Sequence, residues 1–163
     1  MKLTFFPVST GKFVILSIVT FSIYPIFWFY QNWRRIGDAS RAERRIRPLL
    51  RTTLAPVFAT PLLRLIKEQA EAAAIAVEWS PLVLGNAFIV LSLSAFLPKP
   101  WWLMSIGLFA PLLPPLRTCQ RLNAAAGNPE GRNDAYSAGN IATIVIGAVL
   151  WMLVGYAMTI QVS

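Results

Sequence analysis

Uncharged, mostly apolar residues fill four long stretches of the chain, at residues 13–33, 81–97, 101–116 and 141–160. The stretches show neither the alternation of a half-buried strand nor the one-sided repeat of a soluble helix. The first would rise about 31 Å as a helix, close to the roughly 30 Å thickness of the hydrocarbon core of a bilayer. The pattern predicts an all-α integral membrane protein with four transmembrane helices in a single membrane domain.

The second and third stretches are separated only by residues 98–100, which include two prolines. Ser80 followed by Pro81 suits the cap and first position of a helix, because the missing N–H of proline costs nothing there. We therefore expect a helical hairpin. Prolines between residues 111 and 115 should kink or end its second helix, since each removes a hydrogen-bond donor.

A polar segment at residues 34–80 lies between the first two stretches and contains a predicted amphipathic helix. Thr60 and Pro61 can start this helix, which then extends to Trp79. We expect it on the membrane surface or against the bundle of spans. Residues 52–63 are uncharged but too short to cross the membrane, so they are either interfacial or re-entrant.

The positive charges orient these four spans. Twelve Lys and Arg residues lie in the segments 34–80 and 117–140, against Lys2, Lys12 and Lys99 on the other side. Cytoplasmic segments of membrane proteins carry the excess of Lys and Arg. The count predicts that both polar segments are cytoplasmic and that both termini face away from the cytoplasm.

Composition agrees with a membrane protein. Hydrophobic residues make up 56% of the chain and charged residues 13%, against about 45–50% and 25% in soluble domains. The net charge of +8 would suggest nucleic acid as the partner of a soluble protein. Here the positive charge is divided among segments beside apolar spans, so we expect membrane lipids as partners and no nucleic acid.

Several kinds of chemistry are excluded by residues that the chain lacks. It has no histidine and a single cysteine, Cys119, so histidine-dependent catalysis, His-ligated metals and an intramolecular disulfide are ruled out. No charged residue lies within a predicted span, whereas proton-coupled transporters normally need one there. We therefore predict no cofactor, no metal site and no catalytic residue. The lack of these residue types favours a protein that is not an enzyme.

A cluster of arginines follows the first span and is the main candidate contact for anionic lipid or for a partner. Its members are Arg34, Arg35, Arg41, Arg44, Arg45, Arg47 and Arg51. Each basic residue next to an anionic membrane contributes roughly 1 kcal/mol to binding. The alternative is that the cluster only fixes the topology, since pairs such as Arg34 with Asp38 neutralise part of it.

Aromatic residues near the ends of the predicted spans suit the interfacial belt of a membrane protein. They are Trp28, Tyr30, Trp33, Trp79, Trp101 and Trp102.

Small and polar residues within the spans are candidates for helix packing. Asn86 is expected to be buried and to form a hydrogen bond to another helix. Gly139, Thr143 and Gly147 form a row of small residues four apart, which allows close approach of a second helix. That helix could belong to the same bundle or to another subunit of a homo-oligomer.

The most distinctive sequence covers residues 21–34 and reads FSIYPIFWFYQNWR. It resembles the aromatic Y-x-x-YWFYKNW signature of small bacterial membrane proteins in or near the DUF4234 group of unknown function. Phe27 stands where tyrosine is commoner and Gln31 where lysine is commoner. The similarity extends more loosely to residues 51–58, 97–117 and 140–147. This resemblance implies a multi-pass protein of the bacterial inner membrane, and it brings no catalytic residues.

These observations favour a non-enzymatic accessory or scaffold protein that contacts anionic lipid or a membrane-protein partner. The alternative is a lipid-active enzyme or small transporter with a cavity open to the cytoplasmic leaflet, built around Asn86 and the loop carboxylates.

Overall fold

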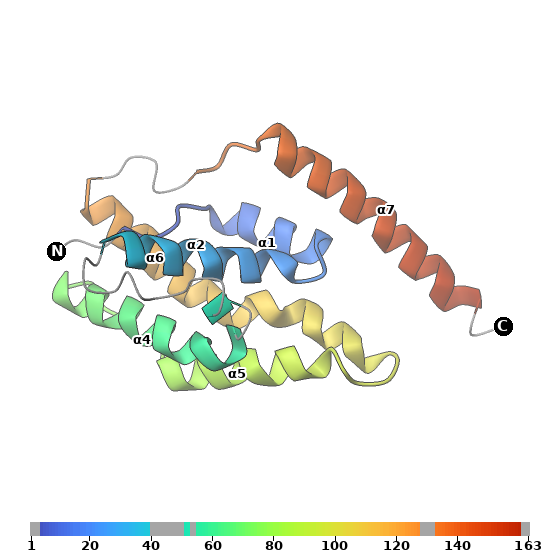
Figure 1. Ribbon diagram of the computed structural model, residues 1–163, viewed down its shortest axis with the longest axis horizontal. Helices are drawn as coiled ribbons and strands as arrows, with labels where there is room; N and C mark the ends of the chain where they lie inside the picture. Colours follow the sequence, from blue (N-terminus) through green and yellow to red (C-terminus); the bar gives the residue numbers. More distant parts are fainter. Residues whose placement is uncertain (1–3, 40–50, 53–54, 128–132, 161–163) are drawn as a thin grey trace.

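The computed structural model describes residues 4–39, 51–52, 55–127 and 133–160. These residues form helices and connecting segments and contain no strand, which confirms the prediction of an all-α protein (Figure 1). The elements are α1 (Thr10–Val19), α2 (Ile23–Ala39), α4 (Ala55–Ala72), α5 (Pro81–Ser94), the 3₁₀ helix η1 (Trp101–Leu112), α6 (Leu113–Ala125) and α7 (Ala138–Ile160).

The first apolar stretch differs from the prediction, because it is divided between two helices. Phe21 and Ser22 have φ angles of 50° and 64°, in the left-handed region where a right-handed helix cannot continue. The chain therefore turns back, and α2 packs beside α1 (Figure 1). The turn is held by other parts of the chain, since the Ser22 hydroxyl donates a hydrogen bond of 2.9 Å to the Ile106 carbonyl.

Helix α2 buries one face, and this face contains two of the aromatic residues expected at the membrane interface. Its buried residues follow the three- and four-residue spacing of an amphipathic helix: Pro25, Trp28, Phe29, Asn32, Trp33 and Ile36. Trp28 is 0% exposed and Trp33 is 3% exposed. Because the turn at residues 20–22 brings α1 and α2 together, these two indoles lie in the protein core and not in an interfacial belt.

An extended segment at residues 4–9 precedes α1 and lies against α2 and α6. Asn123 of α6 accepts a hydrogen bond of 2.8 Å from the Phe5 N–H and donates one of 2.9 Å to the Phe5 carbonyl. Asn32 of α2 accepts a hydrogen bond of 3.0 Å from the Phe6 N–H. Phe5 is 0% exposed, so two buried asparagines satisfy backbone groups that water cannot reach.

Further side chains extend this attachment toward α7. Gln120 donates a hydrogen bond of 2.8 Å to the Val8 carbonyl. Lys12, buried in α1, donates one of 2.7 Å to the Ala135 carbonyl and one of 3.3 Å to Asn133. The start of the described chain is therefore joined both to α6 and to the segment that leads into α7.

Helices α4, α5, η1 and α6 form the other half of the molecule. The predicted amphipathic helix corresponds to α4, which starts earlier than expected, at Ala55, so that Pro61 lies inside it. It also ends earlier than expected, at Ala72 and not at Trp79. Helices α5 and η1 lie side by side and form the expected hairpin (Figure 1). Helices α4 and α5 approach closely, since a Cβ at Gly85 would lie 3.1 Å from the Cβ of Thr60.

Helix α7 lies along the outside of this bundle (Figure 1). Gly147 is its one buried residue within Ala138–Ile160. In the described part of the chain, α7 is the one helix long and apolar enough to cross a membrane, while α1 and α5 are shorter apolar helices. Much of its apolar surface is exposed, for example at Met152 and Tyr156, which are each 67% exposed.

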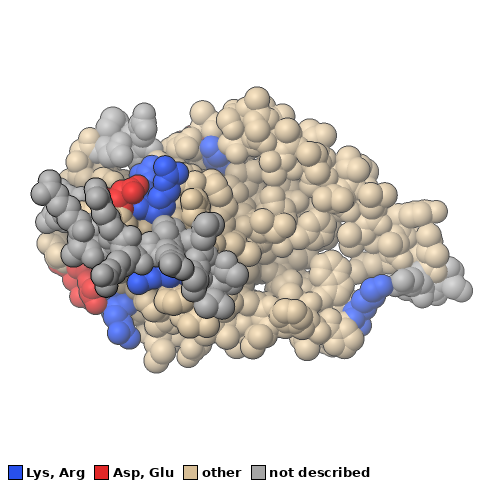
Figure 2. Space-filling model, viewed as in Figure 1, with Lys and Arg blue, Asp and Glu red and all other residues tan. Residues whose placement is uncertain are grey.

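Charged and apolar side chains are separated along the molecule. Figure 2 shows that the charges on this face gather at the end where α2 and α4 terminate. We call this the charged end. The turn between α5 and η1, which contains Lys99, lies at the opposite end (Figure 1).

The two ends of the described chain lie at different ends of the molecule. Arg35 of α2 donates a hydrogen bond of 3.0 Å to the Phe5 carbonyl, so the segment at residues 4–9 lies beside α2. Helix α7 ends at the opposite end of the molecule (Figure 1). The prediction had both termini on one side; the turn at residues 20–22 returns the chain to its starting side and so separates them.

Candidate functional site

The arginines predicted to bind lipid are partly used inside the protein. Arg41, Arg44, Arg45 and Arg47 lie outside the described residues. Arg34 pairs with Asp38 at 4.0 Å, at the predicted spacing, with both side chains largely exposed. Arg35 bonds to the Phe5 carbonyl and lies 5.6 Å from the ring centroid of Phe6.

Arg51 is also engaged with other side chains of the fold. Its guanidinium lies 4.4 Å from the ring centroid of Trp33 and 5.5 Å from that of Phe58. Cation–π contacts of this kind contribute about 0.5–2 kcal/mol. Arg35 and Arg51 therefore hold α2 to neighbouring segments.

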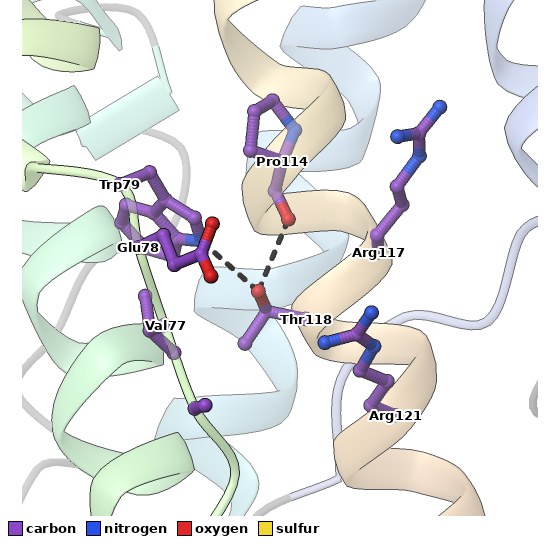
Figure 3. A pocket seen from close by; sticks show the side chains of 8 residues that line it. Val77, Glu78, Trp79, Pro114, Arg117, Thr118 and Arg121 are labelled. Atoms are coloured by element: carbon purple, nitrogen blue, oxygen red, sulfur yellow. Dashed lines mark hydrogen bonds between the residues drawn. The ribbon is translucent and has the colours of Figure 1, made fainter.

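A pocket of about 440 Å³ lies between α6 and the segment that connects α4 to α5 (Figure 3). This pocket is the candidate site. Its lining residues are Ala76, Val77, Glu78, Trp79, Pro114, Arg117, Thr118 and Arg121. Its volume falls within the range of about 300–1,000 Å³ that is typical of small-ligand pockets.

The wall of the pocket is fixed by hydrogen bonds between its two sides. The Trp79 indole donates a hydrogen bond of 3.0 Å to the Thr118 hydroxyl. That hydroxyl in turn donates one of 3.1 Å to the Pro114 carbonyl (Figure 3). Because Thr118 is buried, this chain ties the connecting segment to α6.

Three charged side chains line the pocket, and the structure gives none of them an ionic partner among the described residues. Arg117 and Arg121 are four residues apart on α6, and Glu78 comes from the connecting segment. Figure 3 shows Glu78 and Arg121 reaching into the space between the two walls, with Arg117 one turn nearer the start of α6. All three residues are exposed.

Guanidinium groups determine what this site can bind. Each offers several N–H donors in a planar arrangement that matches the oxygens of a phosphate or carboxylate. The lining has two positive charges and one negative charge, so an anionic group is favoured. No group of three or more potential metal-binding side chains occurs in the described part of the chain.

The pocket lies next to the ends of two apolar segments of the chain. Glu78 and Trp79 come directly before α5, and Arg117 follows the apolar stretch 101–116. One side of the pocket therefore precedes the start of α5, and the other follows the end of η1. These two helix ends lie at the same end of the α5–η1 hairpin. Trp79 was predicted to be an interfacial residue. Arg117 and Arg121 were counted among the charges that orient the spans, and neither was a predicted site residue.

The other predicted interfacial aromatics have different surroundings. Tyr30 and Trp102 are half-buried, whereas Trp101 is exposed at the end opposite the charged end.

Asn86 differs from the prediction, because it is exposed on α5 and not buried between helices. Its neighbour Gly85 is the buried residue and faces Thr60 of α4. Consecutive residues of a helix point about 100° apart, so a shift of one position moves Asn86 from the packed face to the exposed face. The alternative function relied on Asn86 in a cavity, and the pocket does not include it.

The predicted row of small residues has one member in close contact. A Cβ at Gly147 would lie 2.8 Å from the Cβ of Val19 in α1. Gly139 is exposed, and the Thr143 hydroxyl donates a hydrogen bond of 2.8 Å to its carbonyl. The contact within this chain is therefore concentrated at Gly147.

Cys119 lies on α6 and is buried. Burial raises the pKa of its thiol well above the ordinary value, because the thiolate is poorly solvated in the interior. A thiol in this state is a weak nucleophile, so Cys119 belongs to the packing of α6.

Comparison with known proteins gives a family. No curated protein matches the chain, and no solved structure matches it. The model of the family described as "Domain of unknown function (DUF4234)" matches residues 8–159, and the chain, with its aromatic α2 and its helical bundle, belongs to that family.

Proposed function

We propose that this protein is a non-enzymatic accessory protein of the bacterial inner membrane, whose charged end contacts the headgroups of anionic lipids. The observation that supports it most is the pair Arg117 and Arg121, which lines a pocket without an ionic partner among the described residues. The exposed apolar surfaces of α5 and α7 would face lipid chains.

The topology that we propose has the charged end in the cytoplasm. Helices α5, η1 with the first turn of α6, and α7 would then cross the membrane, while α1 and α2 would enter and leave from the cytoplasmic side. Residues 4–9 would lie in the cytoplasm and α7 would end outside it. Of the nine Lys and Arg residues that the structure describes, eight would be cytoplasmic, leaving Lys99. The four-span arrangement places seven of these nine in the cytoplasm, so the asymmetry is stronger here.

Cysteine labelling in intact spheroplasts tests this topology. The variants are Thr4→Cys, Lys99→Cys and Thr159→Cys, and the buried Cys119 can remain in place. With a membrane-impermeant maleimide, we expect labelling at positions 99 and 159 before lysis, and at position 4 only after permeabilisation. Labelling of position 4 in intact spheroplasts would instead support the four-span arrangement, with both termini outside.

Charge reversal in the pocket tests the contact with lipid. The double variant Arg117→Glu and Arg121→Glu should retain several-fold less phosphatidylglycerol than the wild type after extraction, because each basic residue contributes about 1 kcal/mol near an anionic surface. The measurement is native mass spectrometry of bound lipids. Lys99→Glu, at the other end of the molecule, is the matched control. Equal lipid retention in the double variant and the control would contradict the proposal.

A lipid-active enzyme or transporter is the second candidate, and one observation favours it: Glu78 brings a carboxylate into a pocket with two arginines. This candidate predicts that the protein converts or moves lipids added to proteoliposomes. Glu78→Gln should then abolish the activity, whereas an accessory protein would leave the lipids unchanged.

A further inference from the structure

We propose that the pocket between α6 and residues 76–79 selects a headgroup that carries both a phosphate diester and a protonated amine, as in phosphatidylethanolamine. This inference rests on the proposed contact with lipid headgroups. It differs from that contact in one respect, because a headgroup with a phosphate diester and a protonated amine is zwitterionic and not anionic. It starts from the three charges that line one pocket, two positive and one negative.

The two arginines suit the phosphate. Arg117 and Arg121 come from one face of α6, and both guanidiniums lack an ion pair among the described residues. Residues four apart on a helix are neighbours on its surface. Figure 3 shows the Arg121 guanidinium reaching toward Glu78 and that of Arg117 pointing away from it, so Arg117 must change rotamer to bind the same phosphate as Arg121. A phosphate with a single negative charge would balance the net charge of the lining, which has two positive charges and one negative charge.

Glu78 and Trp79 suit the amine. The Glu78 carboxylate belongs to the wall opposite α6 and has no cationic partner within the described residues (Figure 3). Trp79 beside it is half-buried, and its indole N–H is held by Thr118. A fixed indole ring attracts cations through its face, so a carboxylate and an aromatic ring together favour a protonated amine.

The separation of these groups gives the selectivity. The cationic groups come from α6 and the acidic group from the connecting segment. A ligand with phosphate at one end and amine at the other can complement both walls at once. Phosphatidylglycerol has no amine, so the Glu78 carboxylate would stay unpaired next to the negatively charged phosphate of that lipid. Leu82 and Val83 at the start of α5 are 61% and 63% exposed, which gives the acyl chains an apolar surface close to the pocket.

The test is competition between lipids in nanodiscs. The intact protein is reconstituted with equal amounts of phosphatidylethanolamine and phosphatidylglycerol, and the ratio of bound lipids is measured by native mass spectrometry. Glu78→Gln should lower the preference for phosphatidylethanolamine about threefold to fivefold, as expected for one ion pair of up to about 1 kcal/mol. Glu71→Gln, which removes an exposed carboxylate from α4 outside the pocket, should leave the ratio unchanged.

Two further measurements separate the possible failures. The double variant Arg117→Gln and Arg121→Gln should lower binding of both lipids, and unchanged binding would overturn the proposed lipid contact itself. If that variant loses lipid while Glu78→Gln keeps the wild-type ratio, the lipid contact stands and the selectivity for an amine is wrong. Soluble glycerophosphoethanolamine should compete only weakly with phosphatidylethanolamine for the pocket. If it competes as well as the lipid does, the pocket recognises the phosphate and the amine as proposed, but its ligand is a soluble molecule and not a membrane lipid.

Discussion

Replacing Asn123 by leucine should lower the free energy of unfolding by about 1–3 kcal/mol, one of the two largest effects that we expect from a single substitution in this protein. Asn123 is fully buried and bonds to both the N–H and the carbonyl of Phe5. Leucine has a similar size but no polar atoms. The Phe5 carbonyl would keep its hydrogen bond from Arg35, whereas the buried N–H would lose the partner that Asn123 provides.

The measurement is thermal or denaturant unfolding of the purified protein in detergent. Asn86→Leu is the matched control, since it makes the same chemical change at an exposed asparagine with no hydrogen bond from its side chain to another described residue. We expect this control to unfold like the wild type. Equal stability of Asn123→Leu and the wild type would show that the contact of residues 4–9 with α6 contributes little to the fold.

Gly147→Val should separate α7 from α1 and lower stability by about 1–3 kcal/mol, the usual cost of inserting atoms into a packed contact. A Cβ at position 147 would lie 2.9 Å from the carbonyl carbon of Val19. Because that neighbour is backbone, the side chain cannot be accommodated by a change of rotamer. Trp151, which stacks on Phe21 at 4.7 Å and bonds to the Ile18 carbonyl, should leave its place as well.

Gly155→Val is the control for this substitution. Gly155 lies on the same helix, and a Cβ there would meet nothing within 4 Å. The measurement is the midpoint of thermal unfolding, together with the tryptophan emission spectrum, which should change only if Trp151 leaves its stacked position. A fall in stability of equal size in both variants would indicate that valine disturbs α7 by itself, without any role for the contact with α1.

Local patterns in the sequence predicted the helical elements whose ends carry strong signals. Ser80 caps α5 through its side chain, and Pro81 occupies the first turn, as expected for this pair. The spacing of Lys67 and Glu71 on α4 gives an ion pair at 3.9 Å. Such features depend on residues within one or two turns of each other, so the sequence alone suffices to predict them.

The turn at residues 20–22 could not be predicted in this way. Phe21 and Ser22 carry no glycine or proline signal, and their left-handed conformation is disfavoured for both residues. Local backbone hydrogen bonds contribute to the turn, such as that of 2.7 Å from the Ser22 N–H to the Ser17 carbonyl. The side chains of Phe21 and Ser22 are held by groups distant in sequence, Ile106 for the Ser22 hydroxyl and Trp151 for the Phe21 ring. The same dependence on distant groups explains why Trp28 and Trp33, aromatic residues near the end of an apolar stretch, are part of the core.

The sequence by itself determined the helical class, the α5–η1 hairpin and the family, because hydrophobic length, proline positions and a local aromatic motif are properties of neighbouring residues. Only the tertiary structure decided which polar groups are available. Arg35 and Arg51 are used within the fold, while Arg117 and Arg121 line a pocket together with Glu78. These residues are about 40 positions apart in the chain, and packing of the connecting segment against α6 brings them together.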